Sequence, residues 1–255
     1  MSGPSSCSGT PVKGMVSAVR MRQYPPMFPR TALVTGSASG IGSAIVELLR
    51  SEGADVQAFD LADGFDVSDA KAWDAVGEVE LACLNAGVTT GEQDLTRLSD
   101  DAYRRILGAN LDGVVFGARR LAAVMMPGGA IVATASLAGL VPSPDDPIYT
   151  LTKHAVIGFV RSVAPQLEER GITINAIAPG FVDTPLIDSA PFTAAGFPLL
   201  QPEAVAQAAL IAARSGETGR VWVVQPGREP LEFRFPNVPG PRDAAGGSVG
   251  APPPS

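Results

Sequence analysis

Residues 31–42 read TALVTGSASGIG, an apolar run followed by a turn that contains three glycines. The apolar run, Thr31–Thr35, has the length and composition of a buried β-strand. The apolar residues that follow the turn recur at helical spacing: Ile41, Ala44, Ile45, Leu48 and Leu49. This segment therefore predicts a strand, a tight turn and the start of a helix.

The alternation of strands and helices continues along the chain. Gly53 ends the first helix, and a second strand is expected at Ala54–Asp60. Further strands are expected at Phe65–Val67, Leu81–Leu84, Ala130–Ser136, Ile172–Ala178 and Arg220–Val224, and helices at Ser99–Met126, Tyr149–Arg170 and Pro202–Arg214. The strands are apolar throughout, as in parallel sheets that are covered on both faces. We therefore predict an α/β fold: a Rossmann-like, doubly wound parallel sheet of about seven strands in three α/β/α layers.

The composition and the charge exclude several classes of protein. Of the 255 residues, 45% are hydrophobic and 18% are charged, which excludes a wholly disordered chain. The net charge of −7 argues against nucleic acid or an anionic membrane as the main partner. No apolar run approaches the ~20 residues that are needed to span a bilayer. With two cysteines and one histidine, we expect neither a disulfide framework nor a metal site, and we expect a cytoplasmic location.

The two ends of the chain differ in composition from the middle. Residues 1–29 have basic but no acidic side chains, and they lack the apolar core of a secretory signal. Three prolines between positions 25 and 29 argue against the amphipathic helix of an organelle transit peptide. We expect residues 1–29 to be a disordered leader or an overlong start before Met27, and residues 236–255 to be a poorly ordered tail rich in Pro and Gly.

The glycine turn is suited to binding a phosphate group. Glycines let the backbone turn tightly and come close to a pyrophosphate, which the N-terminus of the following helix then stabilises. Asp60 lies 20 residues after Gly40, at the end of the second predicted strand, where a carboxylate can accept hydrogen bonds from an adenosine ribose. Glycines are common in strand–helix turns, and a lone Asp at a strand end is usually a surface carboxylate. The combination of the two features favours a dinucleotide site.

The spacing of these glycines, G-x-x-x-G-x-G over residues 36–42, resembles the cofactor turn of the short-chain dehydrogenase/reductase family. Further matches follow in the family's order: Asp66-Val67, Asn85-Ala86-Gly87, Asn110, Ser136, Tyr149-x-x-x-Lys153 and Pro179–Thr184, which reads PGFVDT. The resemblance covers roughly residues 30–227. It implies that residues 30–235 form one dinucleotide-binding and catalytic domain of an NAD(H)-dependent enzyme that interconverts a secondary alcohol and a ketone. It also implies a homo-oligomer, either a tetramer or a dimer.

The resemblance assigns two sets of residues. The implied cofactor-binding residues are Gly36, Ser39, Gly40, Ile41, Gly42, Asp60, Asp66, Val67, Asn85, Ala86, Gly87, Tyr149, Lys153, Pro179, Gly180, Val182 and Thr184. The implied catalytic residues are Asn110, Ser136, Tyr149 and Lys153. In this assignment Ser136 would hold the substrate oxygen, and Asn110 would support a water that relays protons.

Tyr149 and Lys153 can together carry out the proton transfer that such a reaction needs. They are four residues apart on a predicted helix, so their side chains lie on one face. Tyrosine is too weak an acid at neutral pH unless its phenolate is stabilised, which a nearby ammonium does. The resemblance also gives Lys153 a hydrogen bond to the nicotinamide ribose. Such pairs also occur by chance on amphipathic helices, but this one follows a strand-ending serine and a nucleotide turn.

The residues around Asp60 favour NAD(H) over NADP(H). The Asp60 carboxylate would lie where the 2′-phosphate of NADP must sit, and the two charges repel each other. The neighbouring positions, Ser39 and Leu61, supply no Arg or Lys to neutralise that phosphate.

The predicted substrate lid, Pro185–Leu200, is apolar and contains neither Lys nor Arg. An anionic substrate would normally meet a cation in its binding site. We therefore expect a small, mainly apolar alcohol or ketone. Arg228 and Arg234 of the C-terminal extension would weaken this expectation if the tail folded over the pocket.

Three features depart from the family's pattern. Only 19 positions separate Asp66 from Asn85, so any helix between them must be short. Leu84 stands where the family often has a second Asn. Pro165 is expected to kink the helix of Tyr149 or to end it early.

Two other classes of function stay open. A nucleotide-binding scaffold or redox sensor of the same fold would keep the glycine turn, but it has no chemical need for all four predicted catalytic residues. A hydrolase would have to use His154, which directly follows Lys153, points away from the Tyr149 face and has no G-x-S-x-G elbow before it. We therefore interpret His154 as structural, and Cys83 as a packing residue.

Overall fold

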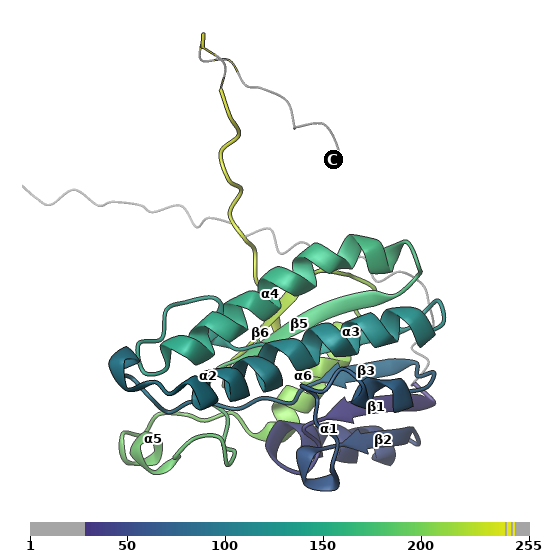
Figure 1. The fold of residues 1–255 in the computed structure, drawn as a ribbon, viewed down its shortest axis with the longest axis horizontal. Coiled ribbons are helices and arrows are strands. Elements are labelled where there is room, and N and C mark those ends of the chain that lie inside the picture. Colours follow the sequence, from purple (N-terminus) through teal and green to yellow (C-terminus); the bar gives the residue numbers. More distant parts are fainter. Residues whose placement is uncertain (1–28, 243, 246, 248–255) are drawn as a thin grey trace, which may run out of the picture.

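Within the residues that the computed structural model describes, 29–242, 244, 245 and 247, seven strands form one sheet (Figure 1). The strand order is β2-β1-β3-β4-β5-β6-β7; β1 to β6 are parallel, and β7 is antiparallel to β6. The bounds are β1 Thr31–Thr35, β2 Asp55–Phe59, β3 Leu81–Leu84, β4 Ala130–Thr134, β5 Thr173–Pro179, β6 Val221–Val224 and β7 Leu231–Glu232. The predicted doubly wound parallel sheet is confirmed. The predicted leader lies outside the described residues except for Pro29.

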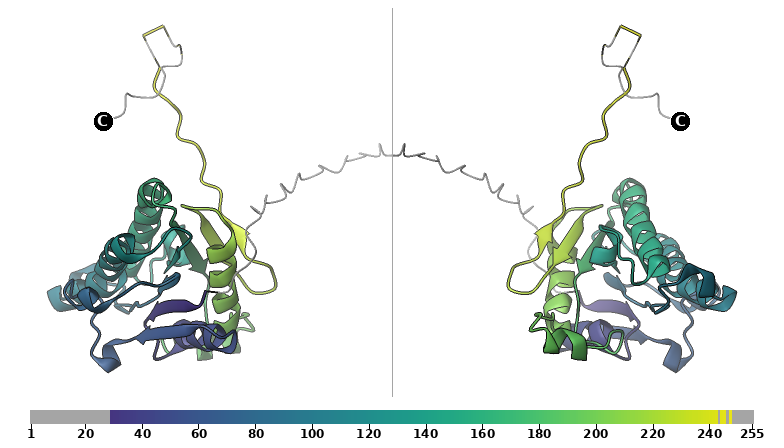
Figure 2. Two further views of the ribbon diagram at one scale, coloured as in Figure 1. Left: turned by 90° about the vertical axis from the view of Figure 1, so that its right-hand side faces the viewer. Right: turned by 90° about the vertical axis from the view of Figure 1, so that its left-hand side faces the viewer.

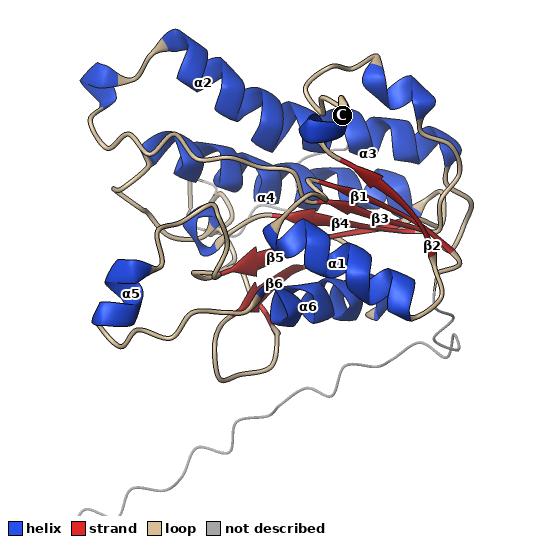
Figure 3. Cartoon of the chain, turned by 90° about the horizontal axis from the view of Figure 1, so that it is seen from below, coloured by secondary structure: helices blue, strands red, loops and turns tan. Residues whose placement is uncertain are grey.

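Helices cover both faces of the sheet and complete three layers (Figure 3). On one face lie α1 (Gly40–Ser51) and α6 (Pro202–Arg214), and on the other lie α2 (Asp100–Leu107), α3 (Gly113–Val124) and α4 (Pro147–Glu168). A short helix, α5 (Ala190–Ala194), precedes α6. Two apolar clusters, one on each face, fill the space between the sheet and its helices. Because the six parallel strands end at the same edge, the segments that follow them meet there.

The strand expected at Phe65–Val67 is absent from the sheet, and that prediction was wrong. A parallel neighbour of β2 needs a crossover of about a dozen residues or more, but the chain between Phe59 and Phe65 makes only a tight 3₁₀ turn. The Phe65 ring instead stacks on Phe59, with centroids 4.3 Å apart, and its N–H donates to the Asp60 carbonyl. β2 is therefore an edge strand, and β7, which the sequence did not predict, completes the seven.

The long helix expected at Ser99–Met126 is a continuous helical run, but a π-helical turn at Gly108–Asp112 divides it into α2 and α3. Pro165 does not end α4 early, because the helix continues to Glu168 with Ala164 and Leu167 buried. The helix expected to be short after Asp66 is one 3₁₀ turn, Ala72–Ala75. Among the helices of the described residues, none is long and apolar enough to cross a membrane.

After β7 the chain leaves the body of the protein. Phe233 still donates its N–H to the Val221 carbonyl, and the Phe235 ring lies 3.7 Å from the Arg161 guanidinium on α4. The following described residues, 236–242, run outward in Figure 2 and belong to the predicted tail.

Candidate active site

The glycine turn connects β1 to α1 at the carboxyl edge of the sheet. Gly36 and Gly40 have φ values of 66° and 53°, in the left-handed region that favours glycine. A side chain at Gly36 would also place its Cβ 2.8 Å from Ala86 Cα, so the turn lies directly on the segment after β3. Ser39, the N-cap of α1, makes no side-chain cap hydrogen bond. The first N–H groups of α1 are therefore suited to an anionic ligand, as the pyrophosphate prediction requires.

The remaining predicted residues of this turn are part of α1 and its packing. A Cβ at Gly42 would overlap the Gly36 carbonyl, so the helix can start this close to the turn only with glycine there. Ile41 is partly buried against the cluster on the α1 and α6 face of the sheet. These two positions shape the turn.

Asp60 follows β2 and lies beside the glycine turn. One carboxylate oxygen accepts a hydrogen bond from Ala38 N–H at 3.0 Å, and the other accepts one from Ala62 N–H at 3.0 Å. Each oxygen keeps a further lone pair. The carboxylate is thus held where it could accept ribose hydroxyls from a nucleotide on the glycine turn.

Asn85 links three strand ends by hydrogen bonds. Its side-chain N–H donates to the Gly36 carbonyl at 3.4 Å, and its side-chain oxygen accepts from the Thr134 hydroxyl at 3.1 Å. The Thr35 hydroxyl accepts the N–H groups of both Asn85 and Ala86. This network fixes the β3 end against the ends of β1 and β4.

Asn110 is fully buried in the π-helical turn between α2 and α3. Its oxygen accepts from Val88 N–H at 2.7 Å, and its two N–H groups donate to the Val88 carbonyl at 2.9 Å and to the Thr152 hydroxyl at 3.1 Å. Both side-chain donors are thus used within the protein. Asn110 anchors the backbone after β3 to α4, and any water would be bound through a remaining acceptor.

Ser136, Tyr149 and Lys153 converge where β4 ends and α4 begins. Lys153 is 3% exposed; its Nζ donates to the Thr134 carbonyl at 2.8 Å and lies 5.4 Å from the Tyr149 ring centroid. Burial lowers the pKa of Lys153 to about 8. Burial also raises the pKa of Tyr149; the hydrogen bond to Ser136 lowers this pKa, and the Asp146 charge raises it further.

The segment Pro179–Thr184 leaves β5 and reaches the glycine turn. Gly180 N–H donates to the Val224 carbonyl at 3.0 Å, and Val182 is buried and pairs with Leu200. The Thr184 methyl group would lie 3.0 Å from a Cβ at Gly40. The structure therefore brings this predicted cofactor segment against the predicted cofactor turn.

Asp66 and Val67 lie in the turn after β2, towards α3. The Asp66 carboxylate accepts hydrogen bonds from the N–H and the hydroxyl of Ser68, at 2.8 and 2.7 Å. Val67 is buried, and a Cβ at Gly113 would come within 2.8 Å of it. Their assignment to the adenine side of a cofactor stays a prediction.

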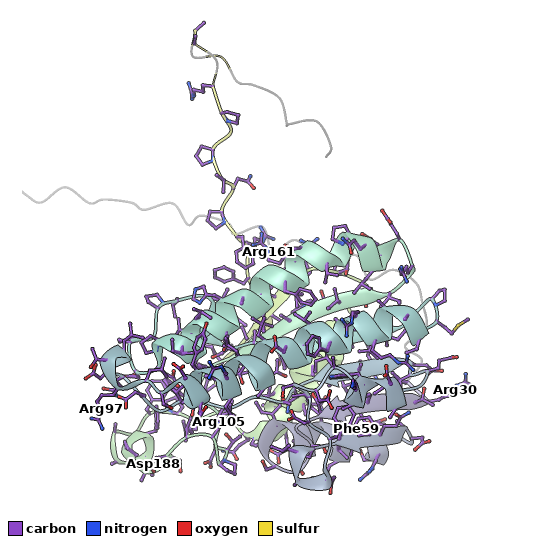
Figure 4. All side chains as sticks on the ribbon, in the orientation of Figure 1. Arg30, Phe59, Arg97, Arg105, Arg161 and Asp188 are labelled. Atoms are coloured by element: carbon purple, nitrogen blue, oxygen red, sulfur yellow. The ribbon has the colours of Figure 1, made fainter. Side chains whose placement is uncertain are left out.

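Two aromatic rings of the predicted lid, Phe192 and Phe197, cluster with Phe181 of the segment that precedes it. Their centroids are 4.6 to 5.8 Å apart, and Phe181 and Phe197 are 48% and 49% exposed. In Figure 4, Asp188 of the same lid lies towards the same end of the molecule as Arg105, opposite Arg30, which precedes β1. The lid thus presents apolar surface at the carboxyl edge of the sheet.

The two arginines of the C-terminal extension lie at different ends of the sheet. Arg228 follows β6 in the hairpin to β7, whereas Arg234 comes after β7 has returned towards the amino ends of the parallel strands. Arg234 lines a cleft of about 690 Å³ together with Arg161 and Glu168, far from the glycine turn. Of these two arginines, Arg228 therefore lies towards the carboxyl edge of the sheet, and Arg234 lies towards the opposite edge.

Asp146 was missed by the sequence analysis. It is 8% exposed, caps α4 and accepts hydrogen bonds from Tyr149 and from the segment after β3. An Asp followed by Pro147 at the first helical position is a helix-start signal that could have drawn attention to it. His154 is exposed, with Nδ1 3.0 Å from the Thr150 carbonyl, and the pKa of buried Cys83 is raised to about 12 by burial, so both fit the structural roles predicted for them.

The chain is similar in sequence and in fold to several known proteins. A family model described as "Enoyl-(Acyl carrier protein) reductase" matches residues 65–224. A 3beta-hydroxysteroid dehydrogenase 2 of Eggerthella lenta is 31% identical over 194 residues, which cover 64% of this chain and 75% of that protein. The crystal structure of a 3-ketoacyl-(acyl-carrier-protein) reductase from Brucella melitensis with NADH matches with a TM-score of 0.70 and 25% identity, over 78% of this chain and 98% of that one. BdcA with NADPH matches with a TM-score of 0.71 and 26% identity, over 82% and 98%.

Proposed function

Because the chain belongs to the short-chain dehydrogenase/reductase family, an oxidoreductase family whose named relatives act on alcohols, we propose that it interconverts a secondary alcohol and a ketone with NAD(H). One observation carries the proposal. The buried Lys153 ammonium and the Ser136 hydroxyl both lie at the Tyr149 phenol, at the edge of the sheet that also holds the glycine turn.

The residues of this edge fit a nicotinamide dinucleotide. The first N–H groups of α1 would hold the pyrophosphate, Asp60 the adenosine ribose, and Lys153 the nicotinamide ribose. When bound, the cofactor supplies the hydride acceptor or donor. Lys153 can serve two partners, because its Nζ carries three protons and the Thr134 carbonyl takes one.

In alcohol oxidation, the Tyr149 phenolate removes the hydroxyl proton while the carbinol carbon loses its hydride. Ser136 holds the substrate oxygen within reach of the phenol. The Lys153 ammonium would stabilise the phenolate electrostatically. Burial raises the pKa of Tyr149, and the hydrogen bond to Ser136 lowers it. In ketone reduction Tyr149 returns the proton, and Asn110 supports a water that passes protons to and from solvent.

The experiment that tests this function follows NADH absorbance while the protein is mixed with NAD and a panel of secondary alcohols, including cyclohexanol and 1-phenylethanol. Turnover supports the proposal. The scaffold or redox-sensor alternative expects tight NADH binding and no turnover on any alcohol of the panel. The presence of Asn110, Ser136, Tyr149 and Lys153 together argues against that alternative, since a protein that only binds a nucleotide has no chemical need for all four.

We expect NADH to bind more tightly than NADPH. A carboxylate about 4 Å from a phosphate costs roughly 1–4 kcal/mol, which corresponds to a difference of about fivefold or more in Kd. Asp60→Asn removes the charge with little change of shape. It should therefore lower the ratio of the NADPH Kd to the NADH Kd about tenfold. Asp63→Asn in the same turn is the matched control. Tighter binding of NADPH than of NADH by the unaltered protein, measured by fluorescence titration, would contradict the prediction.

We also propose a small, mainly apolar substrate, supported by the aromatic cluster that Phe181 forms with Phe192 and Phe197 of the lid. The kcat/KM for cyclohexanol and 1-phenylethanol should exceed that for 3-hydroxybutyrate and 3-hydroxybutyryl-CoA. Phe192→Ala should raise KM for the apolar alcohols about tenfold, because it removes aromatic contact area. A higher kcat/KM for the anionic substrates would contradict this proposal. If Arg228→Ala abolished that preference and Arg234→Ala did not, the β6–β7 hairpin would be the part that selects an anionic substrate.

Homo-oligomeric assembly and a cytoplasmic location stay predictions from the sequence. Size-exclusion chromatography with light scattering tests the assembly, for which we expect the mass of a dimer or a tetramer.

A further inference from the structure

Asp146 accepts four hydrogen bonds from two parts of the chain. Its Oδ1 accepts from Tyr149 N–H at 2.9 Å and from the Thr90 hydroxyl at 2.7 Å. Its Oδ2 accepts from Thr90 N–H at 2.7 Å and from Gly91 N–H at 3.1 Å. Three of the four donors thus belong to the segment after β3, which is more than 50 positions away in sequence.

That segment, residues 87–91, is called the 87–91 loop below, and it lies beside the predicted catalytic groups. A Cβ at Gly87 would be 3.3 Å from Asn110 Oδ1 and 3.4 Å from Lys153 Nζ. Asn110 binds both the N–H and the carbonyl of Val88, and Arg105 donates to the Thr89 carbonyl at 2.9 Å. The loop is therefore fastened at one end next to Lys153 and at the other end to Asp146.

The chemistry of the Asp146 side chain matches the loop better than it matches the helix. Capping α4 needs one acceptor, which Asn or Ser would supply as well as Asp. Accepting two backbone N–H groups on one oxygen, and an N–H plus a hydroxyl on the other, needs two acceptor atoms. In either orientation an Asn amide would turn its NH₂ group towards at least one backbone N–H group that needs an acceptor. A carboxylate at this position is thus explained by the loop.

We propose that Asp146 is a positioning residue, which holds the 87–91 loop as a fixed wall of the alcohol site beside Tyr149 and Lys153. The inference rests on the proposed function, because it assigns the loop to that site. Asp146 does not touch the reacting atoms; it holds the loop, and its charge also raises the pKa of Tyr149.

The test compares Asp146→Asn with the unaltered enzyme. Asn keeps the cap of α4, so the protein should still fold, with a Tm lowered by the two lost hydrogen bonds of the loop. Amide hydrogen exchange in peptides that cover residues 87–91 should become about tenfold faster, since two of the loop's hydrogen bonds are lost. The KM for cyclohexanol should rise about tenfold while kcat changes less than about threefold, and the Kd of NADH should stay unchanged.

The matched control is Asp94→Asn. Asp94 also accepts the N–H and the hydroxyl of one threonine, Thr96, at 2.9 and 2.8 Å, but it does so on the surface and within one short turn. Asp94→Asn should change neither the KM for cyclohexanol nor the amide hydrogen exchange of the 87–91 loop. If Asp146→Asn does not fold, Thr90→Val is the second variant. It removes one bond to Asp146 and the bond that Thr90 accepts from Glu92 N–H, and it leaves the α4 cap intact, so it should give a smaller change in the same two measurements.

The inference would be overturned if amide exchange in the 87–91 loop is unchanged in Asp146→Asn, or if that exchange is faster while KM is unchanged. If only Thr90→Val folds, an unchanged exchange rate and an unchanged KM in that variant would overturn the inference. Failure of the proposed function looks different. A Tyr149→Phe enzyme that keeps its rate refutes the reaction, whereas an inactive Tyr149→Phe enzyme together with a normal KM in Asp146→Asn refutes only the role of Asp146.

Discussion

Replacing Tyr149 with phenylalanine is expected to lower kcat by about 10³-fold, within the range that general acid–base catalysis contributes, and to leave the Kd of NADH unchanged. The substitution removes only the ionisable hydroxyl, and the ring keeps its place near Lys153. Stopped-flow or steady-state measurement of NADH formation with cyclohexanol gives kcat, and fluorescence titration gives the Kd.

Tyr103→Phe on α2 is the matched control, because it removes the same hydroxyl from a partly exposed ring outside the site. It should leave kcat unchanged. A Tyr149→Phe enzyme with a near-normal rate would end the mechanism proposed for this protein.

Lys153→Met is expected to reduce kcat by about 10²-fold or more and to weaken NADH binding as well. One ammonium would stabilise the Tyr149 phenolate and also donate to the nicotinamide ribose, so its loss affects both measurements. This pattern separates Lys153 from Tyr149, whose loss should affect the rate alone. Lys71→Met, on the exposed turn before Ala72–Ala75, is the control and should affect neither.

The same substitution is expected to stabilise the protein at neutral pH. Burial lowers the pKa of Lys153 from 10.5 to about 8, so the folded state loses this proton more easily than the unfolded state does. The unfolded state therefore binds more protons between about pH 8 and pH 10.5, and the contribution of Lys153 to the free energy of unfolding rises through that window. Below pH 8 the buried ammonium lowers the free energy of unfolding by up to about 3 kcal/mol, at ~1.4 kcal/mol per pKa unit. The hydrogen bond from Lys153 to the Thr134 carbonyl offsets part of this loss.

Urea unfolding of both proteins at pH 7 and pH 10 checks this expectation. Lys153→Met should be more stable than the unaltered protein at pH 7, and the difference should shrink at pH 10. A less stable variant at pH 7 would mean that the hydrogen bond to the Thr134 carbonyl outweighs the unfavourable burial of the ammonium.

Local patterns in the sequence were enough for much of the fold and of the candidate site. The bounds of Thr31–Thr35, Leu81–Leu84 and Pro202–Arg214 were predicted as the structure has them, because apolar runs and helical periodicity are properties of neighbouring residues. The shared face of Tyr149 and Lys153 follows from their spacing on one helix. The glycine turn was predictable as well, since its conformation depends on residues within the turn.

Contacts between distant segments were not predictable in this way. Phe65–Val67 looks like a strand by composition, but the chain before it is too short to carry a parallel crossover. β7 and the return of Arg234 to the far end of the sheet depend on pairing with an edge that exists only once the sheet has formed. Asp146 reads as an ordinary helix cap; its bonds to Thr90 and Gly91 arise because β3 and β4 are neighbours and bring the 87–91 loop to the start of α4. Hydrogen bonds across such separations leave no periodic signal in the chain, because they are determined by the packing of elements rather than by the order of residues.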